Sequence, residues 1–107
     1  MKNIKLVNRG FDIEGDPINN SEVELCKAWI KNNMKPRKTI NKRISSYNLK
    51  EKVEKHLSEL KDKGEYSGSY YVSNGAFIKA AIDLGFKYNT NRDINPYFAF
   101  SFVNKNN

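Results

Sequence analysis

The spacing of hydrophobic residues near the start of the chain predicts a helix. Leu25, Trp29 and Ile30 recur at helical intervals and are expected to face the core. Ser21, followed three residues later by a glutamate, has the form of a capping box and predicts where this helix begins. Pro36 predicts where it ends, because the residue before a proline is disfavoured in helical conformation.

Two more helices are predicted further along. One is expected over residues 49–61, with Asn48 as its N-cap. Its buried stripe is Leu49, Val53, Leu57 and Leu60. The last helix begins at residues 73–75 and is apolar on most sides, which is typical of a buried helix. Gly85 is expected just beyond its end, where a left-handed conformation is common.

Short strands are predicted where apolar residues alternate or cluster. Residues 4–7 and 69–72 are expected to be short strands, and residues 9–16 a loop. Residues 96–103 alternate clearly, with Phe98, Phe100 and Phe102 on one face.

This order of elements predicts one α+β domain over residues 1–107, with three helices and a small antiparallel sheet. A chain of this length buries roughly 65% of its unfolded surface, which suffices for a core. A winged-helix-like arrangement is compatible with the order, if residues 70–72 and 98–102 pair as the wing. The last helix lacks the exposed polar face of a groove-reading helix, so any contact with nucleic acid is expected at phosphates.

Basic residues gather in the middle of the chain. The sequence carries 19 Lys and Arg against 12 Asp and Glu, a net charge of +7. No acidic residue occurs between Glu24 and Glu51. Such a run attracts polyanions or acidic protein surfaces. The predicted binding residues are Lys27, Lys31, Lys35, Arg37, Lys38, Lys42, Arg43, Lys50 and Tyr47. The alternative is a solvated lysine-rich face that keeps the protein soluble.

Residues 35–46 are expected to form a basic connecting arm. They show no periodicity and little apolar surface, which favours a mobile segment that orders on binding. Ile40 and Ile44, four residues apart, offer a way to dock it. Before the arm, Lys27, Lys31 and Lys35 are spaced to form a ridge along a helix.

Tyrosines near the basic residues are candidates to stack on unpaired bases or to contact a protein. They are Tyr47, Tyr70, Tyr71, Tyr88 and Tyr97. The alternative is that Tyr71 and Tyr97 pack within the sheet.

The sequence does not contain a combination of residues that is typical of a catalytic site. Cys26 and His56 are the single cysteine and histidine, which leaves no metal cluster and no internal disulfide. Asp12, Glu14 and Asp16 alternate as in a calcium loop, but the distal glutamate is absent. No glycine-rich phosphate loop occurs. We therefore expect no enzyme activity, no metal, no cofactor and no small-molecule substrate.

The sequence also bears on location. The start of the chain does not have the form of a signal peptide, and no apolar stretch approaches the roughly 20 residues that span a bilayer. We expect a cytoplasmic protein that does not bind membranes.

One set of short motifs resembles a known group. SYNLK at 46–50, YVSNGAFI at 71–78, GF at 85–86 and NPYF at 95–98 are similar to a pattern in short, uncharacterised proteins carried by phages and plasmids. Some small proteins of this kind are anti-CRISPR inhibitors. The resemblance covers about residues 41–102, implies a shared fold and transfers no catalytic residue.

Two functions follow from these observations. The first is non-enzymatic binding of nucleic acid through the basic arm. The alternative, which the resemblance favours, is an anti-CRISPR or other anti-defence inhibitor that binds a nucleic-acid-handling effector protein.

Overall fold

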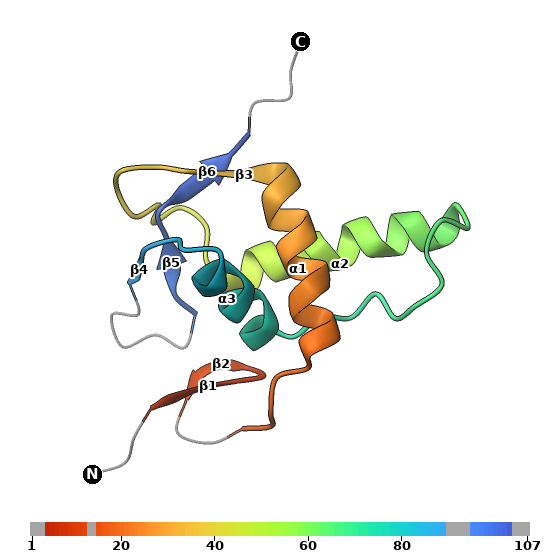
Figure 1. Ribbon diagram of the computed structural model, residues 1–107, viewed down its shortest axis with the longest axis horizontal. Coiled ribbons are helices and arrows are strands. Elements are labelled where there is room, and N and C mark those ends of the chain that lie inside the picture. The colour runs from red at the N-terminus through yellow and green to blue at the C-terminus, as the bar shows by residue number, and fades with distance from the viewer. Residues whose placement is uncertain (1–3, 13–14, 90–94, 104–107) are drawn as a thin grey trace.

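The computed structural model describes residues 4–12, 15–89 and 95–103, which form an α+β fold of three helices and small antiparallel sheets (Figure 1). The helices are α1 (Asn20–Asn33), α2 (Ser46–Asp62) and α3 (Asn74–Asp83). The strands are β1 (Lys5–Val7), β2 (Gly10–Asp12), β3 (Met34–Pro36), β4 (Tyr88–Asn89), β5 (Tyr97–Phe98) and β6 (Phe100–Phe102).

The helix caps differ in part from those predicted. The N-cap of α1 is Asn19, whose side chain accepts from the amide of Ser21 at 2.8 Å, so the predicted start at Ser21 is wrong. The N-cap of α2 is Ser45, not Asn48. Asparagine and serine cap helices about equally well, so neighbouring candidates cannot be separated by type alone. The predicted start of α3 is confirmed, with Ser73 as its N-cap.

The end of α3 also agrees with the prediction. Gly85 has a φ of 92°, and its amide donates to the carbonyl of Ile82 at 2.9 Å. The amide of Phe86 donates to the carbonyl of Ala81 at 3.2 Å. These two bonds form a Schellman motif, which closes the helix and fixes the direction of the chain after it.

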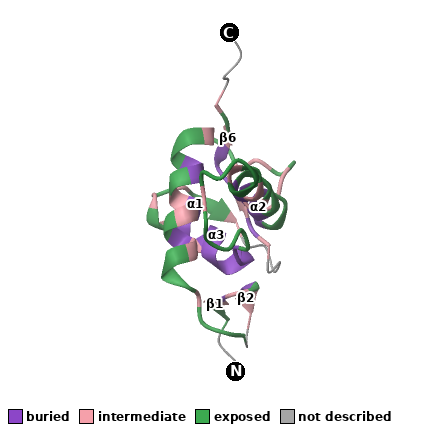
Figure 2. Ribbon diagram, turned by 90° about the vertical axis from the view of Figure 1, so that its right-hand side faces the viewer, coloured by how far each residue is buried: buried purple, intermediate pink, exposed green. Residues whose placement is uncertain are grey.

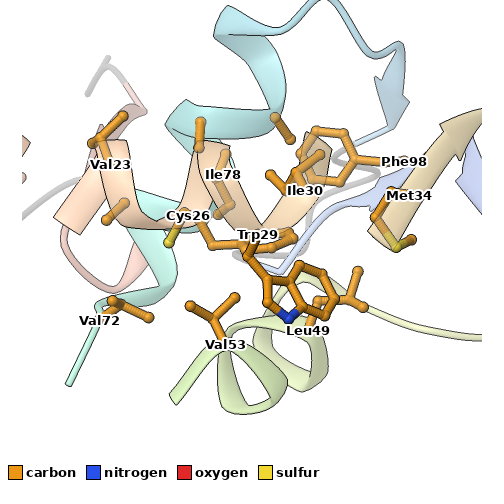
Figure 3. Packing of buried hydrophobic residues seen from close by; sticks show 14 of the residues in the cluster. Val23, Cys26, Trp29, Ile30, Met34, Leu49, Val53, Val72, Ile78 and Phe98 are labelled. Atoms are coloured by element: carbon orange, nitrogen blue, oxygen red, sulfur yellow. The ribbon is translucent and has the colours of Figure 1, made fainter. Parts of the chain in front are cut away.

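The core is built around α3. Phe77, Ile78, Ala80 and Ala81 of this helix are fully buried, and α3 packs against both α1 and α2 (Figure 2). From α1, Trp29 and Ile30 point into the core as predicted, together with Val23 and Cys26, whereas Leu25 is only partly buried (Figure 3). From α2, Leu49, Val53 and Leu57 are buried as predicted, and Leu60 lies at the margin.

The segment of residues 97–102, which contains β5 and β6, changes its pairing partner at Ala99. Before it, β5 pairs with β4, and after it, β6 pairs with β3, both antiparallel. The amide of Ala99 donates to the carbonyl of Lys87 at 2.8 Å, and its own carbonyl accepts from the amide of Arg37 at 2.9 Å. The two halves of residues 97–102 therefore pair with different strands. Phe98 and Phe100 are buried as predicted, while Phe102 lies at the edge of the core.

The predicted wing is not formed. Residues 70–72 are not a strand and do not pair with residues 98–102. β3 occupies the pairing position instead, and the amide of Val72 donates to the carboxylate of Glu54 at 3.2 Å. The other pairing, between β1 and β2, shows that part of the predicted loop at 9–16 is a strand.

The β1–β2 hairpin lies against the start of α3, at the lower edge of Figure 1. The amide of Gly75 donates to the carbonyl of Asn8 at 2.7 Å. A Cβ atom at Gly75 would lie 1.8 Å from the carbonyl oxygen of Val7. The backbones approach this closely only because residue 75 has no side chain.

In the described part of the chain, no helix combines the length and the apolar character needed to cross a bilayer.

Candidate nucleic-acid interface

The basic segment at residues 35–46 is docked on the last strands. Its first two residues, 35 and 36, belong to β3. Three of its backbone amides then donate hydrogen bonds to carbonyls of residues 96–99. The amide of Arg37 donates to the carbonyl of Ala99 at 2.9 Å, that of Asn41 to the carbonyl of Phe98 at 2.8 Å, and that of Ser46 to the carbonyl of Pro96 at 3.0 Å. The side chain of Asn41 adds a bond to the carbonyl of Phe100 at 3.2 Å, and Ile44 packs against the core. The segment is therefore held in place along its length, in contrast to the free arm expected.

Six cations of this region are exposed. One, Lys31, lies in the last turn of α1, and the others lie on β3 and the loop that follows. We call them the basic surface: Lys31, Lys35, Arg37, Lys38, Lys42 and Arg43. In the residues that the structure describes, no carboxylate oxygen lies within 4.0 Å of any of their charged groups. Their positive potential is therefore available to an external anion.

Lys87 is a further cation of this region, which the sequence analysis did not include. Its carbonyl accepts from the amide of Ala99, whose own carbonyl accepts from Arg37, and Lys87 lines a hollow together with Arg37 and Lys38. Lys87 is distant from the basic run in sequence. It lies next to the basic surface because β5 pairs with β4 while the adjoining β6 pairs with β3.

Lys27 is neutralised by acidic neighbours. Its Nζ lies 3.5 Å from carboxylate oxygens of both Glu24 and Asp83. The predicted ridge of Lys27, Lys31 and Lys35 is also wrong, because α1 ends at Asn33 and Lys35 lies on β3. Lys27 therefore holds α1 and α3 together.

Lys50 is buried rather than presented to solvent. Its Nζ lies 3.2 Å from the carboxylate of Glu54 and close to the rings of Tyr47 and Tyr71, at 4.9 and 5.2 Å from their centroids. The same Glu54 oxygen accepts from Val72, so this cluster ties the segment before α3 to α2. Lys50 already has the partners that a phosphate would have to replace.

Replacing Lys50 by alanine tests this structural role. We expect Lys50→Ala to lower the free energy of unfolding by about 1–2 kcal/mol, because the largely buried Glu54 loses its counter-charge. The dependence of nucleic-acid affinity on salt should stay unchanged. Lys38→Ala, which removes an equal charge from the basic surface, should lower the salt slope by about 0.9. Equal loss of slope in both variants would show that Lys50 also contacts phosphate.

The predicted tyrosines fall into different environments. Tyr47, Tyr70 and Tyr71 are 45–52% exposed, and Tyr71 is not part of a sheet. Tyr97 lies on β5 and is half-buried. Tyr88 stacks on Phe11, with ring centroids 5.8 Å apart. Two of the exposed tyrosines, Tyr47 and Tyr71, lie beside Lys50.

The residues with reactive side chains do not assemble a site. Burial, with smaller contributions from the charges of Glu22 and Glu54, raises the pKa of the Cys26 thiol from 9.0 to about 12. Cys26 is therefore protonated at neutral pH and is no thiolate nucleophile. His56 is exposed on α2. Among the described residues, no three His, Cys, Asp or Glu side chains are placed to hold a metal, and the predicted candidate Glu14 lies outside them.

A groove of about 400 Å³ lies between α1 and α2. Its lining is mixed, with apolar residues that include Trp29, Val53 and Leu57 and polar residues that include His56 and Glu65. None of the cations of the basic surface lines this groove.

Comparisons with protein-family models, with curated proteins and with solved structures give no match to this chain.

Proposed function

We propose that this protein binds nucleic acid through the basic surface, without catalysis and largely without reading sequence. The observation that supports this most is the set of six exposed cations without a neighbouring carboxylate in the described residues. The backbone hydrogen bonds of Arg37, Asn41 and Ser46 to residues 96–99 hold the segment that carries most of these cations before a ligand arrives. A surface that is already ordered loses less conformational entropy on binding than a free arm.

The character of α3 favours contacts to phosphates over contacts to bases. A helix that reads the major groove must present polar side chains at its surface. In α3, the apolar residues Phe77, Ile78, Ala80 and Ala81 are buried. The charged residues Lys79 and Asp83 form a salt bridge with each other at 3.3 Å. Binding by phosphate contacts carries little sequence information.

The experiment is a titration of labelled duplex DNA with the purified protein at about 50 and 200 mM salt. About five engaged cations should give a slope of log affinity against log salt of about −4 to −5. Binding with a slope near zero, or no binding at the lower salt, would contradict the proposal.

We further propose a cytoplasmic location. The single cysteine is a buried free thiol, which suits a reducing compartment.

A second candidate function is inhibition of a nucleic-acid-handling effector, of the anti-CRISPR kind. The exposed rings of Tyr47, Tyr70 and Tyr71 favour it, because tyrosine is enriched among the residues that dominate protein interfaces. In this case the basic surface would lie where the effector holds nucleic acid. A cleavage assay with a purified RNA-guided nuclease separates the two functions. Inhibition that Tyr70→Ala and Tyr71→Ala relieve, with weak binding of DNA by the protein alone, would favour the second.

A further inference from the structure

A small hollow interrupts the basic surface between the end of β3 and the residues that follow α3. Its volume is about 220 Å³. Pro36, Leu84, Phe86 and Ala99 give it apolar walls. Pockets that enclose a drug-sized ligand occupy roughly 300–1,000 Å³, so this hollow takes a smaller group.

Three cations, Arg37, Lys38 and Lys87, stand around this apolar hollow. The amide of Arg37 donates to the carbonyl of Ala99 at 2.9 Å, and the amide of Ala99 donates to the carbonyl of Lys87 at 2.8 Å. The guanidinium of Arg37 also donates to Oγ1 of Thr39 at 3.0 Å, which orients it.

Phe86 lines the hollow, and its backbone and its ring are each held by neighbouring residues. The Schellman motif at the end of α3 sets its backbone. Its ring packs edge-to-face on Phe100, with centroids 5.1 Å apart and an interplanar angle of 67°. The residue is only half-buried, so part of it remains accessible from the hollow.

We infer that the hollow holds one unpaired nucleotide, with its base against Phe86 and its flanking phosphates on Arg37, Lys38 and Lys87. A nucleobase is flat, offers a π-face to an apolar wall and is smaller than a drug-sized ligand, and stacking on aromatic rings is the usual way in which proteins hold unpaired bases. A base in an intact duplex is stacked and paired and cannot enter. This inference rests on the proposed function and deepens it: the protein prefers single-stranded to duplex nucleic acid.

The test compares one labelled single strand, the same strand with abasic residues, and a hairpin duplex of equal charge. The native protein should bind the single strand at least about fivefold more tightly than the other two. Phe86→Leu keeps an apolar side chain of similar volume without a π-face. It should weaken binding of the single strand about five- to tenfold and leave duplex binding unchanged. Its thermal unfolding shows whether it is folded.

A second variant keeps the test decisive if Phe86→Leu is unstable. Lys87→Gln should reduce single-strand affinity more than Lys63→Gln, which removes an equal charge from the end of α2 on the opposite side of the molecule (Figure 1). Equal affinity for single strand and duplex, or equal losses for both ligands on Phe86→Leu, would overturn the inference while leaving the proposed function intact. No binding to either ligand would overturn both.

Discussion

Replacing Arg37, Lys38, Lys42 and Arg43 together by alanine is expected to lower the affinity for duplex DNA by about a hundredfold or more at 200 mM salt. Each cation that neutralises a phosphate adds about 0.9 to the slope of log affinity against log salt. The four substitutions should therefore reduce the slope by about three to four. Fluorescence anisotropy of a labelled duplex at several salt concentrations measures both quantities.

The matched control removes the same charge elsewhere. Lys5, Lys55, Lys61 and Lys63 are exposed and lie outside the basic surface. Changing either set of four to alanine lowers the net charge from +7 to +3, because four of the positive charges are removed. The control variant should keep most of the affinity and slope of the native protein. If the two variants lose affinity equally, net charge rather than the basic surface accounts for binding.

Substituting Gly75 by alanine is expected to destabilise the protein by about 3 kcal/mol, at the upper end of overpacking effects. Alanine normally stabilises a helix by about 1 kcal/mol relative to glycine, so helix propensity predicts the opposite sign. The new Cβ would lie 1.8 Å from the carbonyl oxygen of Val7. It would force the β1–β2 hairpin away from α3 and break the bond between Gly75 and Asn8. The thermal midpoint should fall by roughly 12 °C or more.

Gly64 provides the control for this variant. It has a φ of 75° at the end of α2, and a Cβ there meets nothing within 4 Å. Gly64→Ala should therefore cost only about 1 kcal/mol, from the left-handed conformation alone. A Gly75→Ala protein as stable as the native one would show that the hairpin does not pack on α3 as described.

The helices could be predicted because their signals are local. Leu49, Val53 and Leu57 recur at helical spacing, and this spacing alone identifies the buried stripe of α2. Ser73 and Gly85 mark the two ends of α3 by their own conformational preferences. None of these signals depends on a residue far away in sequence.

The strands could not be predicted as well, because their pairings join distant residues. Residues 34–36 carry a lysine and a proline and have no strand pattern, yet they pair with β6. Residues 70–72 have strand-forming side chains but remain unpaired, with Tyr71 half exposed. Strand propensity reflects the packing of neighbours, which a single sequence does not state.

The sequence predicted which part of the chain carries exposed cations, but not which of its cations are buried or paired. The basic run correctly located the exposed cations from Lys35 to Arg43. Charge alone did not reveal that Lys50 is buried against Glu54 or that Lys27 pairs with Asp83. Glu54 lies one turn from Lys50 on α2, so the i, i+4 spacing could have revealed this pair. Asp83 reaches Lys27 only through the packing of α3 on α1, which a single sequence does not state. Lys87 was missed for the same reason, since only the strand pairing at Ala99 brings it to the basic surface.

The most direct test of the central claim, that the basic surface is what meets nucleic acid, is a map of the contact by NMR. Uniformly ¹⁵N-labelled protein would be titrated with a short DNA hairpin at low salt, and amide shift changes followed for each residue. The account predicts the largest changes in residues 35–43 and at Lys87, with residues 55–63 at the far end of α2 unaffected. Changes centred on the groove between α1 and α2 or on Tyr70 and Tyr71, or no changes at all, would contradict it.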